Sequence, residues 1–306
     1  MTFAIILAIA LCLDAVMGEP RGLWSRLPHP AVLMGKAVST CDRILNVGAH
    51  RRIKGVFAIA ALACTAALAG WALQMLGPII TLLVAAILLA QRSLADHVQD
   101  VAIGLRQSDQ AGRDAVAMIV SRDVSDSTPS ATARSAIESL SENFSDGVIA
   151  PAFWFLLAGL PGIAVYKMMN TADSTIGYLT PRHAEFGWAS ARLDDLLNWI
   201  PARLTALLIA LVGRAAHHHR AIRADAGLHR SPNAGWPEAA MAYTMGIALA
   251  GPRSYHGEVR DLAWVNGNGR RDLTPRDIDA AIAIVWKAWG LTVVAALGLG
   301  GLIWAF

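Results

Sequence analysis

The sequence predicts an all-α protein that crosses a membrane several times. Hydrophobic residues make up 55% of the 306 residues, charged residues only 16%, and the mean hydropathy is +0.44. A soluble domain of this size carries roughly a quarter charged residues. The pattern contains helical periodicity but no strand-rich region. We therefore expect a single membrane-embedded domain over residues 1–306, with amphipathic helices and polar loops packed on its cytoplasmic side.

The same composition excludes several classes of protein. The net charge of +3 is too small to indicate a nucleic-acid partner. Cys12, Cys41 and Cys64 have no paired spacing, so neither a disulfide framework nor a zinc site is expected. No basic residue precedes the first apolar stretch, which predicts a retained N-terminal segment instead of a cleaved signal peptide.

Apolar segments of different lengths predict the membrane-spanning helices. Residues 56–90 are too many for one crossing of a hydrocarbon core about 30 Å thick, and Gly77-Pro78 interrupts them, so a helical hairpin is expected. Residues 148–169 are long enough to cross, but Pro151 and the stretch Gly159-Leu160-Pro161-Gly162 leave two alternatives: a kinked span or a re-entrant pair of half-helices. The complete set of apolar segments lies near residues 3–16, 56–76, 79–90, 148–169, 200–212 and 289–306.

Two polar segments have clear helical patterns. Thr274, Pro275 and Asp277 stand at the cap, first-turn and N3 positions of a helix that should run into the last apolar segment. Apolar residues at helical spacing in 91–122 predict amphipathic helices. These residues are Leu94, Val98, Val101, Leu105, Val116 and Ile119.

Basic residues mark cytoplasmic loops, which assigns 17–54 and 213–287 to the cytoplasm. The hairpin brings the chain back, so 91–147 should be cytoplasmic as well. A single crossing at 148–169 would then place 170–199 outside, away from the other polar motifs. That conflict keeps the re-entrant alternative open.

The segment Ser121 to Asp126 concentrates hydroxyls, acids and Arg122 directly after an amphipathic helix. Such a set suits Mg²⁺ and phosphate. The structural alternative is a solvated loop that caps a helix, because Ser and Asp clusters are ordinary turn residues.

Glu138 and Glu142 lie one helical turn apart, where two like charges repel unless a cation lies between them. The alternative pairs Arg134 with Glu138 as an exposed ion pair, and Asn143 to Gly147 then ends the helix.

Lys167, Asn170 and Asp173 recur at helical spacing at the end of an apolar stretch and should share one face. Ionisable residues at a membrane edge favour function when they face the protein interior, although Lys167 could extend to the interface instead. Arg192, Asp194 and Asp195 form a further polar cluster before an apolar helix.

The string from His229 to Glu238 is rich in turn formers, yet it carries Arg230, Trp236 and side chains able to hold a cation or an amine. The chain contains no Walker A loop or dinucleotide fingerprint, so any nucleotide site is not a P-loop.

These strings together resemble the CobD/CbiB family of adenosylcobinamide-phosphate synthases. The resemblance covers nearly the whole chain, and the departures from the family pattern are small, such as Glu19 where many members have Asp and Ala172 where Leu is common. The matching strings include Gly18-Glu19-Pro20-Arg21, Leu27-Pro28-His29-Pro30, Ile137-Glu138-Ser139-Leu140, Ala191-Arg192-Leu193-Asp194-Asp195 and Arg230-Ser231-Pro232-Asn233-Ala234-Gly235-Trp236-Pro237-Glu238.

The resemblance implies an integral membrane ligase of cobalamin biosynthesis that uses ATP and Mg²⁺. Its substrates would be adenosylcobyric acid, an adenosylated corrinoid, and (R)-1-aminopropan-2-ol or its O-phosphate. It also implies the cell inner membrane, a cytoplasmic active site, contact with membrane lipid and association with other late cobalamin-pathway enzymes.

We expect the following roles. The catalytic residues are Asp173, Lys167, Glu142 and Asp194; the substrate- and cofactor-binding residues are Arg122, Arg192, Arg230, Asn143, Asn170, Asn233 and Trp236; the metal ligands are Asp123, Glu138 and Asp146. The alternative from another class is a non-catalytic membrane carrier or scaffold for a corrinoid. Acids and bases lie mainly in the polar loops instead of inside the spans, which speaks against a transport path.

Overall fold

The computed structural model describes residues 2–120, 122–255, 258–260 and 262–305. It is 75% helical, which confirms the all-α prediction. Ser121 and Phe306, which two sequence predictions include, lie outside the described residues. Contacts divide the chain into a first unit, Met1–Ala90 with Ala150–Asn198 and Val293–Phe306, and a second unit, Gln91–Ile149 with Trp199–Thr292. The single membrane-embedded domain remains a prediction.

Among the described residues, four helical stretches are long and apolar enough to cross a membrane, namely Arg51–Gln74, Pro78–Gln107, Pro129–Ile176 and Pro275–Ile303. The helices Trp188–Leu197 and Trp199–Val212 would add a fifth if they act as one span, and Phe3–Met17 is a shorter apolar helix. The prediction of a polytopic membrane protein is therefore confirmed.

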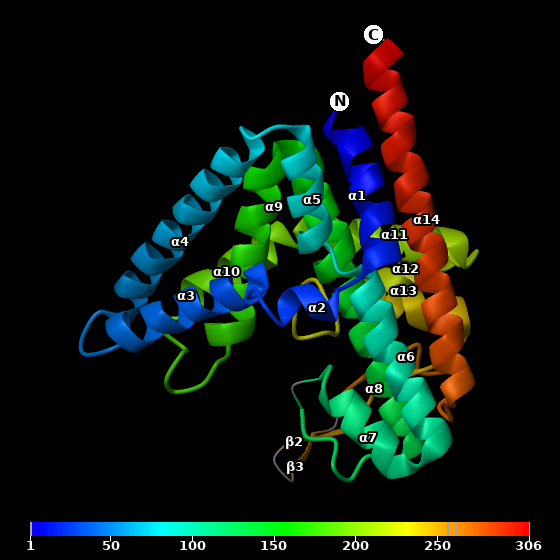
Figure 1. The fold of residues 1–306 in the computed structure, drawn as a ribbon. Helices are drawn as coiled ribbons and strands as arrows, with labels where there is room; N and C mark the ends of the chain where they lie inside the picture. The colour runs from blue at the N-terminus through cyan, green and yellow to red at the C-terminus, as the bar shows by residue number, and fades with distance from the viewer. Residues whose placement is uncertain (1, 121, 256–257, 261, 306) are drawn as a thin grey trace. The chain divides into compact units, whose positions relative to one another are not determined.

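The first unit is built around one long helix, α9 (Figure 1). Two glycines let α4 pack closely on its neighbours: a Cβ on Gly70 would overlap the Leu160 carbonyl in α9, and a Cβ on Gly55 would overlap the Phe186 carbonyl in the loop after α9. The elements of this unit are α1 (Phe3–Met17), α2 (Arg21–Trp24), α3 (Pro30–Leu45), α4 (Arg51–Gln74), α5 (Pro78–Leu88), α9 (Ala150–Ile176) and α10 (Trp188–Leu197).

The predicted hairpin is present in the first unit. Helix α4 ends at Gln74 and α5 begins at Pro78, directly after Gly77. Gly77 has φ 105°, a backbone conformation that residues with a Cβ rarely adopt. Pro78 stands at the first helical position, where its missing backbone N–H leaves no donor without a partner. Figure 1 shows the short turn between the two helices.

Helix α9 is broken inside the apolar segment where the sequence placed a kink or a re-entrant turn. Ala158 and Gly159 leave the helical conformation, with Gly159 at φ 62° and ψ −147°. The backbone N–H of Leu160 then donates to Oε1 of Gln74 at 2.9 Å. This side chain satisfies a donor that the break removes from the helical ladder. The kinked span and the re-entrant pair both remain predictions.

Helices and two small sheets form the second unit. Strand β1 pairs antiparallel with β4, with Leu249 opposite Val265, and β2 pairs antiparallel with β3. The elements are α6 (Gln91–Gln107), α7 (Asp109–Ala117), α8 (Pro129–Phe144), a π-helix (Ser145–Ile149), α11 (Trp199–Val212), η2 (Ala216–His218), α12 (His219–Ala226), α13 (Gly235–Met245), β1 (Leu249–Ala250), β2 (Arg253–Tyr255), β3 (Glu258–Arg260), β4 (Trp264–Val265) and most of α14 (Pro275–Ala305).

Two local predictions are confirmed in this unit. Helix α14 begins at Pro275, and Oδ2 of Asp277 accepts hydrogen bonds from the N–H and the hydroxyl of Thr274 at 2.7 and 2.9 Å. Helix α6 is amphipathic and buries Val98 and Val101.

The expectation that Asn143 to Gly147 ends a helix is wrong. Helix α8 continues through the π-helix Ser145–Ile149 into α9 without a helix stop. Asn143 donates to the carbonyl of Ser139 at 2.9 Å inside the helix, and Gly147 does not adopt a positive φ. Since Ser145, Val148 and Ile149 are buried, packing keeps this segment helical where turn propensity favoured a stop.

Candidate functional site

A cavity of about 230 Å³ opens at the N-terminus of α8 in the second unit. Thr128 caps this helix, with its hydroxyl accepting from the N–H of Ala131 at 3.3 Å, and Pro129 occupies the first position. A helix N-terminus carries partial positive charge and favours anions. The walls are Arg122, Asp123, Val124, Ser125, Asp126, Ser127, Thr128, Ala131, Arg134, Ser135, Glu138, Ala250 and Pro252.

A buried ion pair forms one side of this cavity. Nη2 of Arg122 lies 2.6 Å from Oε2 of Glu138, and the two side chains are only 12% and 4% exposed. The other carboxylate oxygen, Oε1, accepts from the N–H of Ala250 at 2.6 Å. Ala250 has φ 58°, which is rare for a residue with a side chain, so the turn that presents this N–H is held by its surroundings.

The alternative pairing of Arg134 with Glu138 is wrong. Arg134 donates to the carbonyl of Arg271 at 3.0 Å and stacks over the ring of Trp264 at 4.7 Å. A buried carboxylate is stable only with charged or hydrogen-bonded partners close by, and the segment before α8 supplies Arg122 in that place.

The segment before α8 is a turn as well as a cavity wall. Oδ1 of Asp123 accepts from the N–H of Ser125 at 3.0 Å, which is the turn geometry that the structural alternative predicted. Asp123 and Asp126 are exposed and line the cavity beside Arg122. Binding of phosphate and Mg²⁺ there stays a prediction.

A second cavity of about 240 Å³ adjoins the first, and its lining is mostly polar. It shares Arg122, Ser135 and Glu138 with the first cavity. Its remaining walls are Ile119, Val120, Ser139, Glu142, Asn143, His229 and Glu238. Glu142 and Asn143, predicted from sequence as site residues, therefore face a cavity with Glu138, whereas His229 and Glu238 were not among the predicted site residues.

The turn before α13 is organised by an arginine that the sequence prediction missed. Arg203 donates from Nη1 to Oδ1 of buried Asn233 at 2.8 Å, and its guanidinium lies 4.7 Å from the ring centres of both Trp199 and Trp236. Arg230 is exposed. Asn233 and Trp236 thus contact Arg203, and a substrate-binding role for them stays a prediction.

In the first unit, polar side chains gather between α9 and α10. Asp194 accepts from Nδ2 of Asn170 at 3.3 Å and from Nδ2 of Asn198 at 3.0 Å. Oδ1 of Asn198 in turn accepts from the buried hydroxyl of Tyr166 at 2.9 Å. The carboxylate of Asp173 is close enough to repel that of Asp194 electrostatically. Asn170 and Asp173, which were predicted to share one helical face, therefore both lie near Asp194.

Two predicted residues stand apart from that cluster. Arg192 is exposed, and its guanidinium is 3.9 Å from Asp195 instead of Asp194. Lys167 lies near His29. Burial is the main cause that lowers the pKa of the His29 imidazole; the charge of Glu19 opposes this lowering, and the charge of Lys167 adds to it.

A Cβ on Gly177 would overlap the carboxylate of Asp173, so glycine there leaves room for that side chain.

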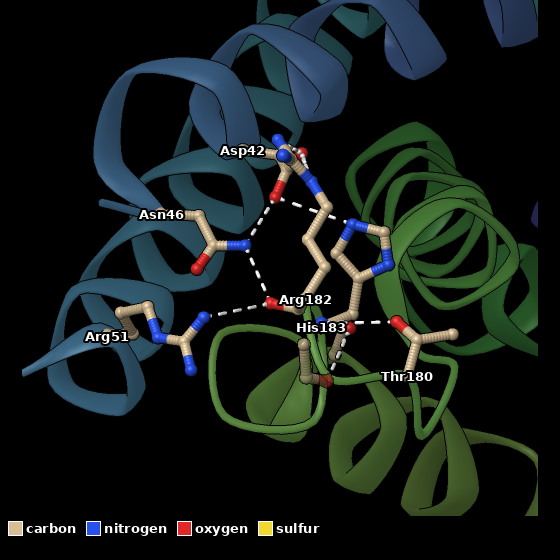
Figure 2. A network of polar contacts seen from close by, with 8 residues as sticks. Asp42, Asn46, Arg51, Thr180, Arg182 and His183 are labelled. Atoms are coloured by element: carbon tan, nitrogen blue, oxygen red, sulfur yellow. Dashed lines mark hydrogen bonds and ion pairs between the residues drawn. The ribbon is translucent and has the colours of Figure 1, made fainter. Parts of the chain in front are cut away.

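A polar latch, Asp42 with Asn46, Arg182 and His183, fastens the loop between α9 and α10 onto α3 (Figure 2). Asp42 accepts from Arg182 Nη2 at 2.6 Å and from Asn46 Nδ2 at 2.7 Å, and His183 Nε2 lies 3.5 Å away. Burial raises the pKa of Asp42, but the hydrogen bonds and charges of these neighbours outweigh it and leave the pKa below its ordinary value.

The pKa of Asp42 is lower in the folded protein than in the unfolded chain. The ionised carboxylate therefore contributes its full stabilisation of the fold above the unfolded pKa of about 3.9, and this contribution disappears as the pH falls through the lower folded value. We expect Asp42→Asn to lower the free energy of unfolding at pH 7 by about 1 kcal/mol. The effect is no larger because Arg182 is exposed and solvent partly screens its charge. Thermal unfolding in detergent should show this difference shrinking below about pH 4. Glu185→Gln, at an exposed ion pair with Arg51, should change little, and a pH-independent effect of Asp42→Asn would contradict the latch.

The predicted residues divide between the two units. The first unit holds Lys167, Asn170, Asp173, Arg192 and Asp194, and the second holds Arg122, Asp123, Glu138, Glu142, Asn143, Asp146, Arg230, Asn233 and Trp236. Of the three predicted metal ligands, Asp123 and Glu138 line the first cavity, and Asp146 lies in the π-helix. Within the described part of the chain, no three His, Cys, Asp or Glu side chains are grouped as a metal site.

Comparison with known proteins identifies the family. The family described as CobD/Cbib protein matches residues 7–285. The chain belongs to the CobD/CbiB family. Relatives in this family from Sinorhizobium sp and Rhizobium meliloti (strain 1021), both named Cobalamin biosynthesis protein CobD, are 51% and 49% identical; the matches cover 97% and 95% of this chain and 98% and 95% of the relatives.

A more distant member of the CobD/CbiB family, from Rhodobacter capsulatus and bearing the same name, is 43% identical over 100% of this chain and 99% of its own. No solved structure matches the chain. The resemblance to the CobD/CbiB family drawn from the sequence motifs is thus confirmed.

Proposed function

We propose that the chain is an enzyme of cobalamin biosynthesis that forms an amide bond at the expense of ATP. Its substrates would be adenosylcobyric acid and (R)-1-aminopropan-2-ol or its O-phosphate. Membership of the CobD/CbiB family and the printed names of the relatives support the pathway. The apolar helices support a membrane location, and we place the protein in the inner membrane with a cytoplasmic active site, where ATP is present.

The observation that carries this proposal is the cavity at the start of α8 with Arg122 in its wall. A carboxylate does not accept an amine until one oxygen becomes a leaving group, and phosphoryl transfer from ATP to the corrinoid carboxylate would provide one. Arg122 offers N–H donors that suit phosphate oxygens. The hydroxyls of Ser125, Ser127 and Thr128 and the N-terminus of α8 add further donors.

The same cavity suits a magnesium nucleotide. Mg²⁺ in nucleotide sites keeps several waters and binds one or two carboxylates together with phosphate oxygens. Asp123 and Asp126 are exposed carboxylates of the cavity wall and would supply that number of ligands. Mg²⁺ bound there would neutralise part of the negative charge of the phosphate groups. Further site residues are proposed in both units. In the first unit they are Lys167, Asn170, Asp173, Arg192 and Asp194, and in the second they are Asp146, Arg230, Asn233 and Trp236.

The test is a mass-spectrometric assay of purified protein in detergent. Adenosylcobyric acid, aminopropanol or its phosphate, Mg²⁺ and ATP are supplied together and then omitted one at a time. An amide product that appears only with ATP is expected. Corrinoid that is retained but unmodified, while an active family member works alongside, would contradict the ligase and favour the carrier.

A further inference from the structure

We infer that the end of α11 and the helix α12, both in the second unit, bind the headgroups of anionic phospholipids, and that the exposed face of α11 contacts the acyl chains of these lipids. The inference does not depend on the proposed amide synthesis. It assigns a ligand class to the basic segment 213–224, which the proposed reaction does not use.

Helix α11 exposes an apolar stripe. Its members recur at intervals of four, three and four residues, which places them on one helical face. Each of them is between 36% and 51% exposed. The stripe consists of Ile200, Leu204, Leu207 and Leu211. Together with α10, α11 is apolar enough to form a broken membrane span, so lipid is the cover that this stripe fits.

The length of α11 limits how it meets the membrane. Its 14 residues extend about 21 Å, whereas the hydrocarbon core is about 30 Å thick. Helix α11 alone therefore does not reach from one side to the other. A helix with an apolar face and a basic flank is stable at the boundary between acyl chains and headgroups, and the basic flank of α11 begins directly after its last residue, Val212.

A sharp turn ends α11 and fixes the first arginine of this flank. The N–H of Arg214 donates to the carbonyl of Leu211 at 3.1 Å, and the N–H of Ala215 donates to the carbonyl of Ala210 at 2.7 Å. This pattern closes a helix through one left-handed residue. Arg214 is that residue, with φ 56°, although glycine is favoured there. The turn therefore holds the Arg214 backbone beside the end of the apolar stripe.

The charge of the segment 213–224 is uncompensated. The segment contains three arginines and three histidines but no Asp or Glu. Arg214, Arg220 and Arg223 are exposed, and within the described part of the chain none of their side chains forms an ion pair or a hydrogen bond. Such a surface is complementary to a ligand with net negative charge.

Helix α12 presents two of these arginines to its surroundings. It buries Ile222 and packs against α13, while Arg220 and Arg223, three residues apart, stay exposed. The first acid after the segment, Asp225, is turned to other partners, since its Oδ2 accepts from the hydroxyl of Tyr243 at 3.0 Å. The fold therefore leaves the arginines available for an external anion.

An anionic phospholipid satisfies both parts of this surface with one molecule. Guanidinium groups donate paired N–H bonds to phosphate oxygens, and the acyl chains cover the apolar stripe. Each basic residue near an anionic membrane surface strengthens binding roughly fivefold. A zwitterionic lipid such as phosphatidylcholine carries its own cation beside the phosphate, so the surface should prefer phosphatidylglycerol.

Native mass spectrometry of the full-length, delipidated protein in detergent tests this inference. Phosphatidylglycerol and phosphatidylcholine are titrated separately, and the bound lipids are counted. We expect the wild type to prefer phosphatidylglycerol. The triple variant Arg214→Gln, Arg220→Gln and Arg223→Gln should bind phosphatidylglycerol on the order of 10²-fold more weakly and phosphatidylcholine as the wild type does. Rising salt concentration should weaken only the binding of phosphatidylglycerol.

Three controls separate the headgroup contact from other effects. Lysine at the same three positions keeps the charge and should keep most of the affinity. Arg276→Gln removes an exposed arginine that lies between Asp277 and, two residues further on, Asp279, and it should change little. Leu207→Ser with Leu211→Ser should weaken the binding of both lipids, because the apolar contact is common to them. Thermal unfolding without lipid should be close to wild type for the glutamine variant, because its arginines have no described partners to lose.

Equal affinity of the wild type and the glutamine variant for phosphatidylglycerol would overturn the inference. Competition of millimolar inorganic phosphate with phosphatidylglycerol would also overturn it, because the segment would then be a site for a free anion. Loss of phosphatidylcholine binding in the glutamine variant, to the same extent as phosphatidylglycerol, would show that the arginines do not recognise the headgroup charge.

Discussion

Replacing Arg122 by alanine should lower the free energy of unfolding by about 3–5 kcal/mol, because it leaves the Glu138 carboxylate buried without its charged partner. Glu138 is 4% exposed on its side chain, Arg122 lies at its Oε2, and its Oε1 accepts from the N–H of Ala250. The same change removes one of the two arginines, Arg122 and Arg134, that line the cavity proposed for phosphate, so amide formation should fall by on the order of 10²-fold or more.

Thermal unfolding in detergent and the mass-spectrometric assay measure these two effects separately. Arg92→Ala, at an exposed ion pair with Asp96, serves as the control and should change stability by less than about 0.5 kcal/mol. Replacing both partners, as Arg122→Met with Glu138→Leu, should recover much of the stability but none of the activity. Wild-type unfolding of Arg122→Ala would show that the buried pair does not stabilise the second unit.

The second large effect is expected at the break in α9. Gly159→Ala should destabilise the first unit by about 2–4 kcal/mol, the sum of backbone strain and a lost hydrogen bond. Gly159 has φ 62° and ψ −147°, and an added Cβ would overlap Oε1 of Gln74, the acceptor of the Leu160 N–H. The new methyl group therefore displaces the Gln74 side chain, which accepts the hydrogen bond of the Leu160 N–H at the break.

The unfolding temperature in detergent checks this prediction. Gly298→Ala is the matched control, since no atom lies within 4 Å of a Cβ there and the residue is in a regular helix. It should be neutral or slightly stabilising, because alanine favours helix more than glycine does. Gln74→Leu should remove the hydrogen bond to the Leu160 N–H without adding backbone strain, and its destabilising effect should be smaller. Equal stability of Gly159→Ala and wild type would contradict the proposed role of the break.

Several features followed from sequence because their causes are local. The start of α14 depends on the cap, proline and acid at Thr274, Pro275 and Asp277, all within one turn. The hairpin depends on Gly77 and Pro78, and the number of apolar residues limits which helices can cross a membrane. Each cause acts between near neighbours in the chain, so local sequence was sufficient.

The candidate site was predictable only in part. The spacing of Asn170 and Asp173 on one helical face was enough to expect them together, and both meet Asp194. The partner of Glu138 was not predictable, because Arg122 and Arg134 are both plausible and the choice depends on where the loop before α8 folds back. Likewise, His229 and Glu238 became candidates only when they appeared in the cavity with Glu138.

By itself, the sequence determined the all-α membrane class, the main helix boundaries and the family, because hydropathy, caps and motifs are written in consecutive residues. The tertiary structure alone decided which charges are buried and how they pair, as with Arg122 and Glu138. It also decided that Ser145–Ile149 stays helical and that Arg203 supports Asn233. These outcomes depend on contacts between distant segments, where burial outweighs local propensity.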